Sequence, residues 1–393
     1  MTHSILIAIR IASVVGSLTA AGYYVVCLWS ARAYLRETRR ESQEQANLGF
    51  NLPRVSILKP LKGVDPEIYE SFRSHCDQDY PADYEIIFGV SEADDPAVEV
   101  VERLRQEFPQ RRIEQIVCTE RLGLNVKISN LAQMLRNARY DCLIVNDSDI
   151  RVEPTYLRRT IAPLLDPNVG LVTCLYRAKA SATLGSCLES LGISTDFAPG
   201  VLVARFVEKG VRFGLGSTLA FRRRELEAIG GFESLLDYLA DDYQLGKRIS
   251  DLGRRVALSD VVVETFLPAY TLRQFLRHQL RWGRAIRDSR RGGYLGLIFT
   301  FGLPWALLAA LANYRKMWAW GLLALVVGLR LAVALIVGIR VLGERQVLNW
   351  LLLLPLRDLM TVVVWTASLA GNTVEWRGDN FTVKDGRLIQ RSE

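Results

Sequence analysis

The sequence lacks the two glycine-rich loops that most often cradle phosphates. No GxxxxGK[ST] pattern occurs, and no GxGxxG follows the first strand-like run at residues 54–61. These absences exclude the binding modes in which the N–H groups of such a loop hold a nucleotide's phosphates. A diphosphate ligand would therefore need another counter-charge.

Paired cysteines are also missing. The six cysteines show no CxxC spacing, so neither a disulfide framework nor a zinc site is indicated. In a reducing compartment, such cysteines are best interpreted as small buried hydrophobic residues.

Apolar residues, by contrast, are abundant. Half of the 393 residues are hydrophobic and the mean hydropathy is +0.13, which is too apolar for an ordinary soluble protein. The first apolar run, residues 5–29, is long enough to cross a bilayer core, and it lacks a small-residue cleavage site. We therefore predict an uncleaved N-terminal membrane anchor at residues 1–30.

The anchor is followed by a basic linker at residues 31–51, which contains Arg32, Arg36, Arg39 and Arg40. The positive-inside rule then predicts that the chain beyond the anchor lies in the cytoplasm. The net charge of +7 could suggest nucleic acid, but the basic residues lie beside apolar segments. An anionic phospholipid surface is therefore the predicted partner, and nucleic acid is not.

A second apolar zone covers residues 292–372 and precedes a polar tail at 373–393. Three stretches in it are long enough to span a bilayer, at residues 293–313, 317–343 and 347–371. Pro304, Arg330 and Arg357 leave interfacial or re-entrant alternatives open for these stretches. We predict two to three C-terminal transmembrane helices, with the tail inside or outside accordingly.

Between the two apolar zones, residues 52–270 alternate short β-rich runs with helical patterns. This alternation predicts an α/β domain with a mostly parallel, Rossmann-like sheet covered by helices on both faces. Ligands of such sheets bind outside the carboxyl ends of the strands. Polar residues follow three of these ends, namely Lys59, the Asp94-Asp95 pair and the Asp147-Ser148-Asp149 triplet.

The acidic residues have a structural and a functional interpretation. Asp95 and the pair Asp147 and Asp149 could cap a helix or a turn. Two carboxylates that flank one serine also suit a hard divalent cation, Mg2+ or Mn2+, that is shared with phosphate oxygens. Lys59 and Lys127 would then be accessory cations for the diphosphate.

Asp242 follows Asp241 at a predicted helix start. The two acids could be an N-cap pair, or one of them could act as a general base toward a hydroxyl. The glycine-rich turn before them, at residues 214–218, serves either backbone geometry or the close approach of a ligand.

Residues 271–291 are predicted to form a basic amphipathic helix that lies on a membrane surface. His278, Arg281 and Trp282 share one face of it, at spacings of three and four residues. An arginine for a diphosphate and an aromatic side chain for a sugar or a lipid would use that face.

Seven blocks of the sequence resemble, in order and spacing, the ceramide glucosyltransferases. The blocks are VSILKPLKGVDP (55–66), DYP (79–81), ADDPAVEV (93–100), GLNVKISNL (123–131), NDSDIRV (146–152), ADDYQLGKRI (240–249) and HQLRW (278–282). The resemblance implies a GT-A fold and an inverting, metal-dependent transfer of one sugar, glucose or N-acetylglucosamine, from a UDP-sugar to a lipid hydroxyl.

The resemblance also implies roles for individual residues. Asp95 would contact the uridine part of the donor, and Asp147 with Asp149 would hold the Mg2+ or Mn2+ ion on the diphosphate. Asp242 would be the catalytic base. Arg281 and Trp282 match the RW of the family's (Q/R)xxRW motif, while His278 departs from it where the family has Gln or Arg.

Residues 172–178 and 196–206 resemble a bacterial branch of the same family that adds N-acetylglucosamine to the hopanoid bacteriohopanetetrol. This resemblance favours a bacterial inner-membrane protein and leaves ceramide and hopanoid open as acceptors. Three alternatives remain: a processive polysaccharide synthase, a polyprenyl-phosphate glycosyltransferase, and an inactive membrane sensor of sugar nucleotides.

Overall fold

A computed structural model describes residues 2–46, 52–376 and 379–390 of the chain. The chain divides into two compact units. The sheet unit comprises residues 37–179, 207–268 and 378–393, and the helical unit comprises residues 1–36, 180–206 and 269–377.

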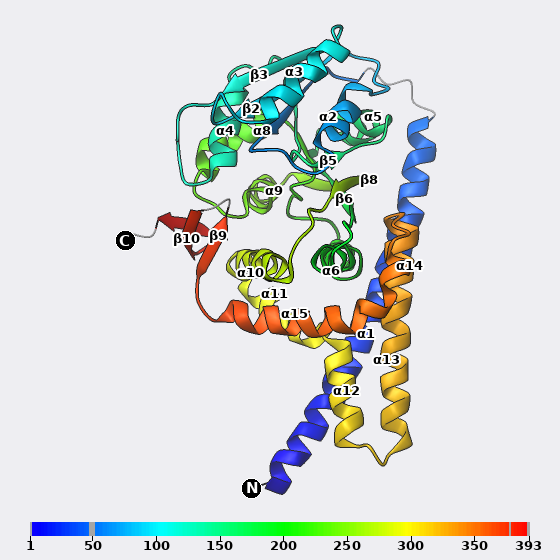
Figure 1. Cartoon of the computed structure of the whole chain (residues 1–393). Helices are drawn as coiled ribbons and strands as arrows, with labels where there is room; N and C mark the ends of the chain where they lie inside the picture. Colours follow the sequence, from blue (N-terminus) through cyan, green and yellow to red (C-terminus); the bar gives the residue numbers. More distant parts are fainter. Residues whose placement is uncertain (1, 47–51, 377–378, 391–393) are drawn as a thin grey trace. The chain divides into compact units, whose positions relative to one another are not determined.

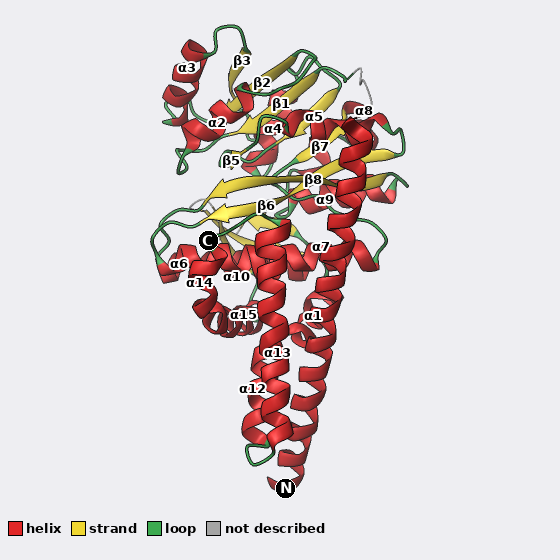
Figure 2. Cartoon of the chain, turned by 90° about the vertical axis from the view of Figure 1, so that its right-hand side faces the viewer, coloured by secondary structure: helices red, strands yellow, loops and turns green. Residues whose placement is uncertain are grey.

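The sheet unit contains an eight-stranded sheet with the order β3-β2-β1-β4-β7-β6-β8-β5 (Figure 2). Its strands are β1 (Val55–Pro60), β2 (Tyr84–Val90), β3 (Arg112–Val117), β4 (Cys142–Val145), β5 (Ile150–Arg151), β6 (Val169–Lys179), β7 (Leu219–Arg222) and β8 (Arg255–Phe266). Strands β1 to β4 are parallel, as is the β6–β8 pair, whereas β7 runs antiparallel to β4 and β6. The predicted, mostly parallel sheet is therefore confirmed.

The helices between the strands lie where the alternating pattern predicts them. They are α2 (Ile68–Cys76), α3 (Ala97–Glu107), α4 (Val126–Leu135), α5 (Tyr156–Ile161), α8 (Arg223–Ala228) and α9 (Asp241–Asp251). Apolar residues of α2, α3 and α5 share one core with Ile57 and Phe88 on one face of the sheet. Helix α4 covers the other face, where a Cβ on Gly89 would stand 2.3 Å from the sulfur of Met134.

A β-hairpin closes the described part of the sheet unit. Strands β10 (Asp379–Lys384) and β11 (Arg387–Gln390) pair antiparallel across the turn Asp385-Gly386. Both turn residues have positive φ, 53° and 77°, as the tightest two-residue hairpin turn requires. The part of the predicted polar tail that lies within residues 379–390 is thus an ordered hairpin.

The helical unit is built around long apolar helices. Helix α1 (Thr2–Ala46) is continuous through the predicted anchor and most of the predicted linker, of which residues 47–51 lie outside the described residues. The other main helices are α6 (Leu184–Gly192), α7 (Ala198–Val207), α10 (Leu272–Ser289), α12 (Gly302–Ala312), α13 (Met317–Leu335) and α15 (Leu354–Leu369). Shorter elements include the π-helical turns η2 (Ile193–Phe197) and η5 (Ile336–Val341), the helices α11 (Arg291–Gly296) and α14 (Val347–Trp350), and strand β9 (Thr373–Trp376).

Three helices are long and apolar enough to cross a membrane, at Ser4–Arg40, Met317–Val341 and Val347–Leu369. A fourth candidate is the bent pair Arg291–Thr300 and Gly302–Ala312. Within the helical unit, α1, α12 and α13 lie along one another and α15 lies crosswise to them (Figures 1 and 2). The chain is therefore a membrane protein with the predicted N-terminal span.

The predicted basic helix is confirmed as α10. Thr271 and Gln274 form a capping box at its start, in which each side chain satisfies a backbone N–H group of the first turn. The prediction for the cysteines is also confirmed, since all six are free and buried: Cys27, Cys76, Cys118, Cys142, Cys174 and Cys187.

Candidate active site

The loop that follows β4 is held in place by a buried asparagine. The Nδ2 atom of Asn146 donates to the carbonyl of Ser217 at 2.7 Å and to the hydroxyl of Thr218 at 3.1 Å. Asn146 is fully buried, so these bonds join the loop firmly to the glycine-rich turn. The next residue, Asp147, is thereby positioned at the carboxyl end of the sheet.

Asp147 and Asp242 converge on the same glycine. A Cβ on Gly216 would stand 3.0 Å from Oδ2 of Asp147 and 3.3 Å from Oδ2 of Asp242. The N–H of Gly216 also donates to Oδ2 of Asp242 at 2.8 Å. A side chain at this position would fill the space between the two carboxylates, so the glycine-rich turn serves the site as well as the backbone.

Lys127 supplies a positive charge beside these acids. Its Nζ lies 2.7 Å from Oδ1 of Asp147 and 3.2 Å from Oδ2 of Asp241. Burial disfavours the charged lysine, but Asp147 and Asp241 outweigh that effect and raise the pKa of Lys127 above its ordinary value. Lys127 is therefore a permanent cation between the loop after β4 and the start of α9.

Lys59 lies beneath the same loop and is fully buried. Its Nζ donates to the carbonyl of Asp147 at 2.9 Å. Burial lowers the pKa of Lys59 to about 7, although Asp149 and Asp147 partly oppose this shift. Its ammonium group thus contacts the loop from inside the fold, whereas the sequence predicts a contact with the donor itself.

Asp149 lies deeper in the site than Asp147. Its carboxylate accepts a hydrogen bond from the Thr265 hydroxyl of β8. Desolvation, with the nearby charge of Asp147, raises the pKa of Asp149 to about 6. The helix that follows begins only at Tyr156, with Thr155 at its N-cap position. Asp147 and Asp149 therefore do not cap this helix.

The second acidic pair does not supply the N-cap residue of α9, because the helix begins at Asp241 and its N-cap residue is Ala240. Oδ1 of Asp242 does accept a hydrogen bond from the N–H of Tyr243 in the first turn, at 2.7 Å. Desolvation and the charge of Asp241 raise the pKa of Asp242 to about 6, against the opposing effect of Lys127. A half-buried carboxylate with a raised pKa is suited to accept a proton.

Asp95 combines a structural role with its predicted position. Its carboxylate accepts hydrogen bonds from the N–H of Ala97, at the start of α3, and from the N–H of Gly63 at 2.9 Å. Gly63 has a φ of +70°, in the left-handed region that favours glycine. The cap predicted for Asp95 thus exists, and the same carboxylate also fixes the loop after β1.

The residues present are suited to a divalent cation. Asp147 offers a half-exposed carboxylate next to Gly216, and carboxylate oxygens are preferred ligands of Mg2+ and Mn2+. Among the described residues, no group of three or more His, Cys, Asp or Glu side chains has the geometry to hold a metal ion. Ligands beyond the protein, such as diphosphate oxygens, would have to complete the shell.

The three predicted motif residues of α10 lie in the helical unit. The rings of His278 and Trp282 face each other with centroids 5.1 Å apart, and the ring of Phe197 lies 6.0 Å from Trp282. His278 and Trp282 therefore lie on one face of α10, as predicted.

Glu189 of α6 holds two residues of the HQLRW motif at once. Its Oε1 lies 3.1 Å from Nδ1 of His278, and its Oε2 accepts from Nε2 of Gln279 at 2.9 Å. The carboxylate of Glu189 is fully buried. Sequence analysis missed this residue, because a single glutamate in an apolar helix has no local pattern that identifies its partners.

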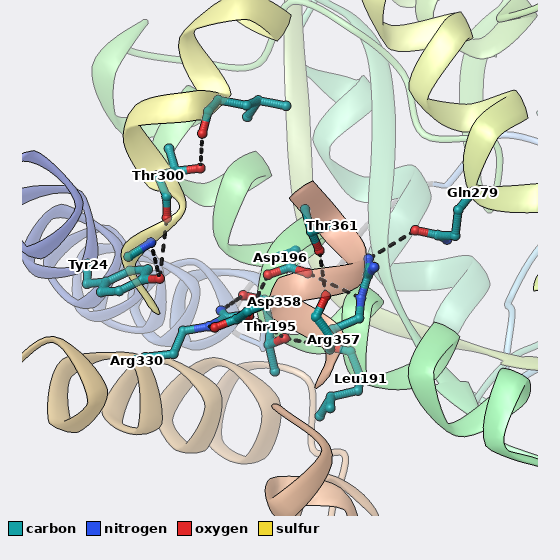
Figure 3. A network of polar contacts seen from close by, with 12 residues as sticks. Tyr24, Leu191, Thr195, Asp196, Gln279, Thr300, Arg330, Arg357, Asp358 and Thr361 are labelled. Atoms are coloured by element: carbon teal, nitrogen blue, oxygen red, sulfur yellow. Dashed lines mark hydrogen bonds and ion pairs between the residues drawn. The ribbon is translucent and has the colours of Figure 1, made fainter. Parts of the chain in front are cut away.

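A buried polar network continues from this motif into the apolar helices (Figure 3). Nη2 of Arg357 donates to Oε1 of Gln279 at 3.0 Å, and Nε of Arg357 lies 3.4 Å from Oδ2 of Asp196. Nη2 of Arg330 lies 2.6 Å from both Asp196 and Asp358. The two arginines that left α13 and α15 uncertain as spans are thus neutralised inside the helical unit.

Comparisons with known proteins identify the family of the chain. The model of "Glycosyl transferase family 21" matches residues 12–389. "Ceramide glucosyltransferase 1" of Caenorhabditis elegans is 23% identical over 364 residues, which are 87% of this chain and 74% of that protein. "Ceramide glucosyltransferase 3" of the same organism is 28% identical over 59% of this chain and 50% of its own length.

Among solved structures, a mannosyltransferase of Pyrobaculum calidifontis in complex with GDP-Man and Mn2+ superimposes with a TM-score of 0.51. It is 20% identical, and the match covers 93% of this chain and 99% of that one. This likeness concerns the fold, and it agrees with the GT-A fold that the resemblance implied. The chain belongs to glycosyl transferase family 21 and is a hexosyltransferase with a GT-A-like fold.

Proposed function

We propose that this protein transfers one sugar from a UDP-sugar to the hydroxyl group of a membrane lipid, with inversion at the anomeric carbon. One observation carries the proposal: the carboxylates of Asp147 and Asp242 meet at Gly216, at the carboxyl end of the sheet. The first lies beside the cation Lys127, and the second has the raised pKa of a proton acceptor. One acid thus serves the leaving diphosphate, and the other serves the incoming hydroxyl.

In the proposed reaction, Asp242 takes the proton from the lipid hydroxyl as its oxygen bonds to the anomeric carbon. The bond from that carbon to the diphosphate oxygen breaks on the opposite side, and UDP leaves with the electron pair. A pKa of about 6 leaves the Asp242 carboxylate ionised at neutral pH and still basic enough to act. Lys127 stabilises the charge that develops on the diphosphate.

The remaining residues have supporting roles in this proposal. Asp147 and Asp149, with diphosphate oxygens, would hold Mg2+ or Mn2+, which neutralises charge on the leaving group when bound. Asp95 would contact the uridine part of the donor. His278, Arg281 and Trp282 would contact the donor from α10. Lys59 would act through the loop that carries Asp147, because its ammonium is buried beneath that loop.

The identity of the acceptor is inferred from the relatives and from the membrane helices. The curated relatives are named ceramide glucosyltransferases, and a membrane-embedded enzyme meets its lipid substrate in the bilayer. We propose glucose or N-acetylglucosamine as the sugar and ceramide or a hopanoid as the acceptor. The proposed site of reaction is the cytoplasmic face of a bacterial inner membrane.

A substrate panel tests the proposal directly. Purified protein is incubated with UDP-glucose, UDP-galactose or UDP-N-acetylglucosamine, and with ceramide, bacteriohopanetetrol, diacylglycerol or polyprenyl phosphate, and products are identified by mass spectrometry. A single sugar on a lipid hydroxyl is expected. Products with several sugars would favour a processive synthase, and transfer only to polyprenyl phosphate would also overturn the proposal.

The role of Asp242 is tested in parallel. Asp242→Asn should lower turnover about 10²–10⁴-fold, as loss of a general base does, while UDP affinity stays within about twofold of the wild type. Equal losses of UDP binding and turnover would reject Asp242 as the base. Metal-stimulated UDP release by the wild type would exclude an inactive sensor.

A further inference from the structure

The segment that leads into the acidic pair, residues 236–239, is held along both of its edges. On one edge, the carbonyl of Leu236 accepts from the N–H of Asn125 at 2.7 Å, and the carbonyl of Tyr238 accepts from its Nδ2 at 2.8 Å. The backbone carbonyl of Asp237 and the N–H of Leu239 bond to a different partner, on the other edge of the segment.

That other edge is occupied by the C-terminal hairpin. The N–H of Leu388 donates to the carbonyl of Asp237 at 2.6 Å, and the N–H of Leu239 donates to the carbonyl of Gly386 at 3.1 Å. The hairpin is thus joined to this segment by one antiparallel bridge between Tyr238 and Arg387.

Side chains reinforce the backbone contact. The ring of Tyr238 has the guanidinium of Arg387 5.0 Å from its centroid and that of Arg248 5.1 Å from it. Nε of Arg387 also donates to the Tyr238 hydroxyl at 3.2 Å. Arg248 belongs to α9, so Tyr238 links the hairpin to the helix that carries the acids.

The hairpin is built to stay in this position. Its side chains Phe381, Val383 and Leu388 are buried, with at most 4% of their surface exposed. Each such burial stabilises a folded chain by about 1.5–3 kcal/mol. The hairpin is therefore part of the packed fold of the sheet unit.

We propose that the C-terminal hairpin, through Arg387 and Tyr238, is a positioning element for Asp241 and Asp242. Helix α9 has no side-chain cap at Ala240, so the placement of its first residues depends on the segment before it as well as on Lys127 and Gly216. Asn125 holds one edge of that segment, and the hairpin holds the other. The inference rests on the proposed function in one respect, namely that Asp242 is the base.

The test compares the wild-type chain with three separate variants: Arg387→Ala, Arg387→Lys, and a deletion of residues 379–393. Turnover is followed as UDP release from UDP-glucose or UDP-N-acetylglucosamine with whichever of ceramide and bacteriohopanetetrol is accepted. A displacement of a catalytic group by 1 Å can cost about 10²-fold in rate. We expect turnover to fall about tenfold in Arg387→Ala and about 10²-fold or more in the deletion variant. In Arg387→Lys, turnover should fall by less than in Arg387→Ala.

Two further readouts separate positioning from general damage. The donor KM and the UDP affinity of Arg387→Ala should stay within about twofold of the wild type, since the hairpin supports the base and not the donor acids. In Arg387→Ala, the fall of kcat/KM at acidic pH should begin at a lower pH than in the wild type. The reason is that a less firmly held first turn of α9 admits water, which lowers the raised pKa of Asp242. Lys384→Ala, at an exposed position of the same hairpin, is the matched control and should behave as the wild type.

Wild-type turnover and an unmoved pH profile in Arg387→Ala would overturn the inference. If the deletion does not fold, Arg387→Ala with intact UDP binding decides the question alone. Full activity of Asp242→Asn, together with slow turnover of Arg387→Ala, would reject the proposed base without rejecting a role of the hairpin in setting α9.

Discussion

The Nζ atom of Lys127 lies 2.7 Å from Oδ1 of Asp147, and this ion pair connects helix α4 to the loop after β4. Lys127 also reaches Asp241, so one buried cation serves two acidic segments that are distant in the sequence. In the proposed reaction, its positive charge would take the place of the phosphate-binding loop that the sequence lacks.

Lys127→Met should weaken UDP binding about tenfold or more, which corresponds to about 1.4 kcal/mol. The reason is that the variant leaves Asp147 and Asp241 to repel the diphosphate without compensation. Isothermal titration calorimetry with UDP checks this. Lys247→Met, which removes only the exposed pair with Asp251, should bind UDP as the wild type does. Unchanged affinity in Lys127→Met would contradict the role given to this lysine.

The pH dependence of kcat/KM should follow Asp242. Desolvation and the charge of Asp241 raise its pKa to about 6, and a base acts only when ionised. Activity should therefore be constant well above pH 6 and fall about tenfold per pH unit below it. Asp241→Asn removes a like charge, so its acidic limb should lie at lower pH than that of the wild type. Asp251→Asn, on the exposed part of α9, should not change the pH at which kcat/KM falls.

Glu189→Gln should leave the side chains of His278 and Gln279 less firmly held. The carboxylate serves His278 and Gln279 at the same time, and an amide offers only one acceptor oxygen. If the motif contacts the donor as proposed, we expect the donor KM to rise about tenfold with a smaller change in kcat. Glu375→Gln, which breaks the exposed ion pair between Glu375 of β9 and Arg277 of α10, is the control. Equal donor KM values for both variants would argue against a positioning role for Glu189.

Arg330→Met should destabilise the helical unit by about 3–5 kcal/mol, because it leaves Asp358 and Asp196 buried without their partner. The double change Arg330→Met with Asp358→Leu should recover part of that loss. Thermal unfolding in detergent micelles measures both. Arg315→Met, on the exposed turn between α12 and α13, should unfold at the wild-type temperature. A wild-type midpoint for Arg330→Met would show that the network carries little stability.

The hairpin also predicts the membrane topology. It belongs to the same compact unit as the eight-stranded sheet, so residues 269–377 must cross the membrane an even number of times. Of the three candidate spans in this range, we expect the bent pair Arg291–Thr300 and Gly302–Ala312 and the helix Met317–Val341 to cross, and Val347–Leu369 not to cross.

Cysteine labelling in sealed vesicles measures this topology, since the native cysteines are buried. An impermeant maleimide should reach Val64→Cys and Asp385→Cys from the same side, and Lys316→Cys from the opposite side. Labelling of Val64→Cys and Asp385→Cys from opposite sides would reject the even count.

Local patterns predicted much of the fold, because strand and helix periods of β1 to β4 and α2 to α5 are written in consecutive residues. They also located Asp147 and Asp242. The meeting of these two acids at Gly216 was not predictable, since it depends on how the turn at 214–218 packs across the sheet.

The C-terminal hairpin has a turn signal in its sequence, and the sequence analysis did not use it. Asp385-Gly386 between alternating apolar residues is a strong local sign of a tight hairpin, although the region was interpreted only as a polar tail. Its attachment to residues 237–239 remained out of reach, because backbone pairing across the fold leaves no mark in either segment.

The order of synthesis gives the hairpin one more consequence. Residues 379–390 leave the ribosome only after the apolar helices between residues 291 and 369 have been made. Until those helices have entered the bilayer and the hairpin has bonded to residues 237–239, the segment before α9 is held on one edge only. If the hairpin positions Asp242 as proposed, a nascent chain would bind sugar nucleotide before it could use it, and full turnover would be delayed until membrane assembly is complete.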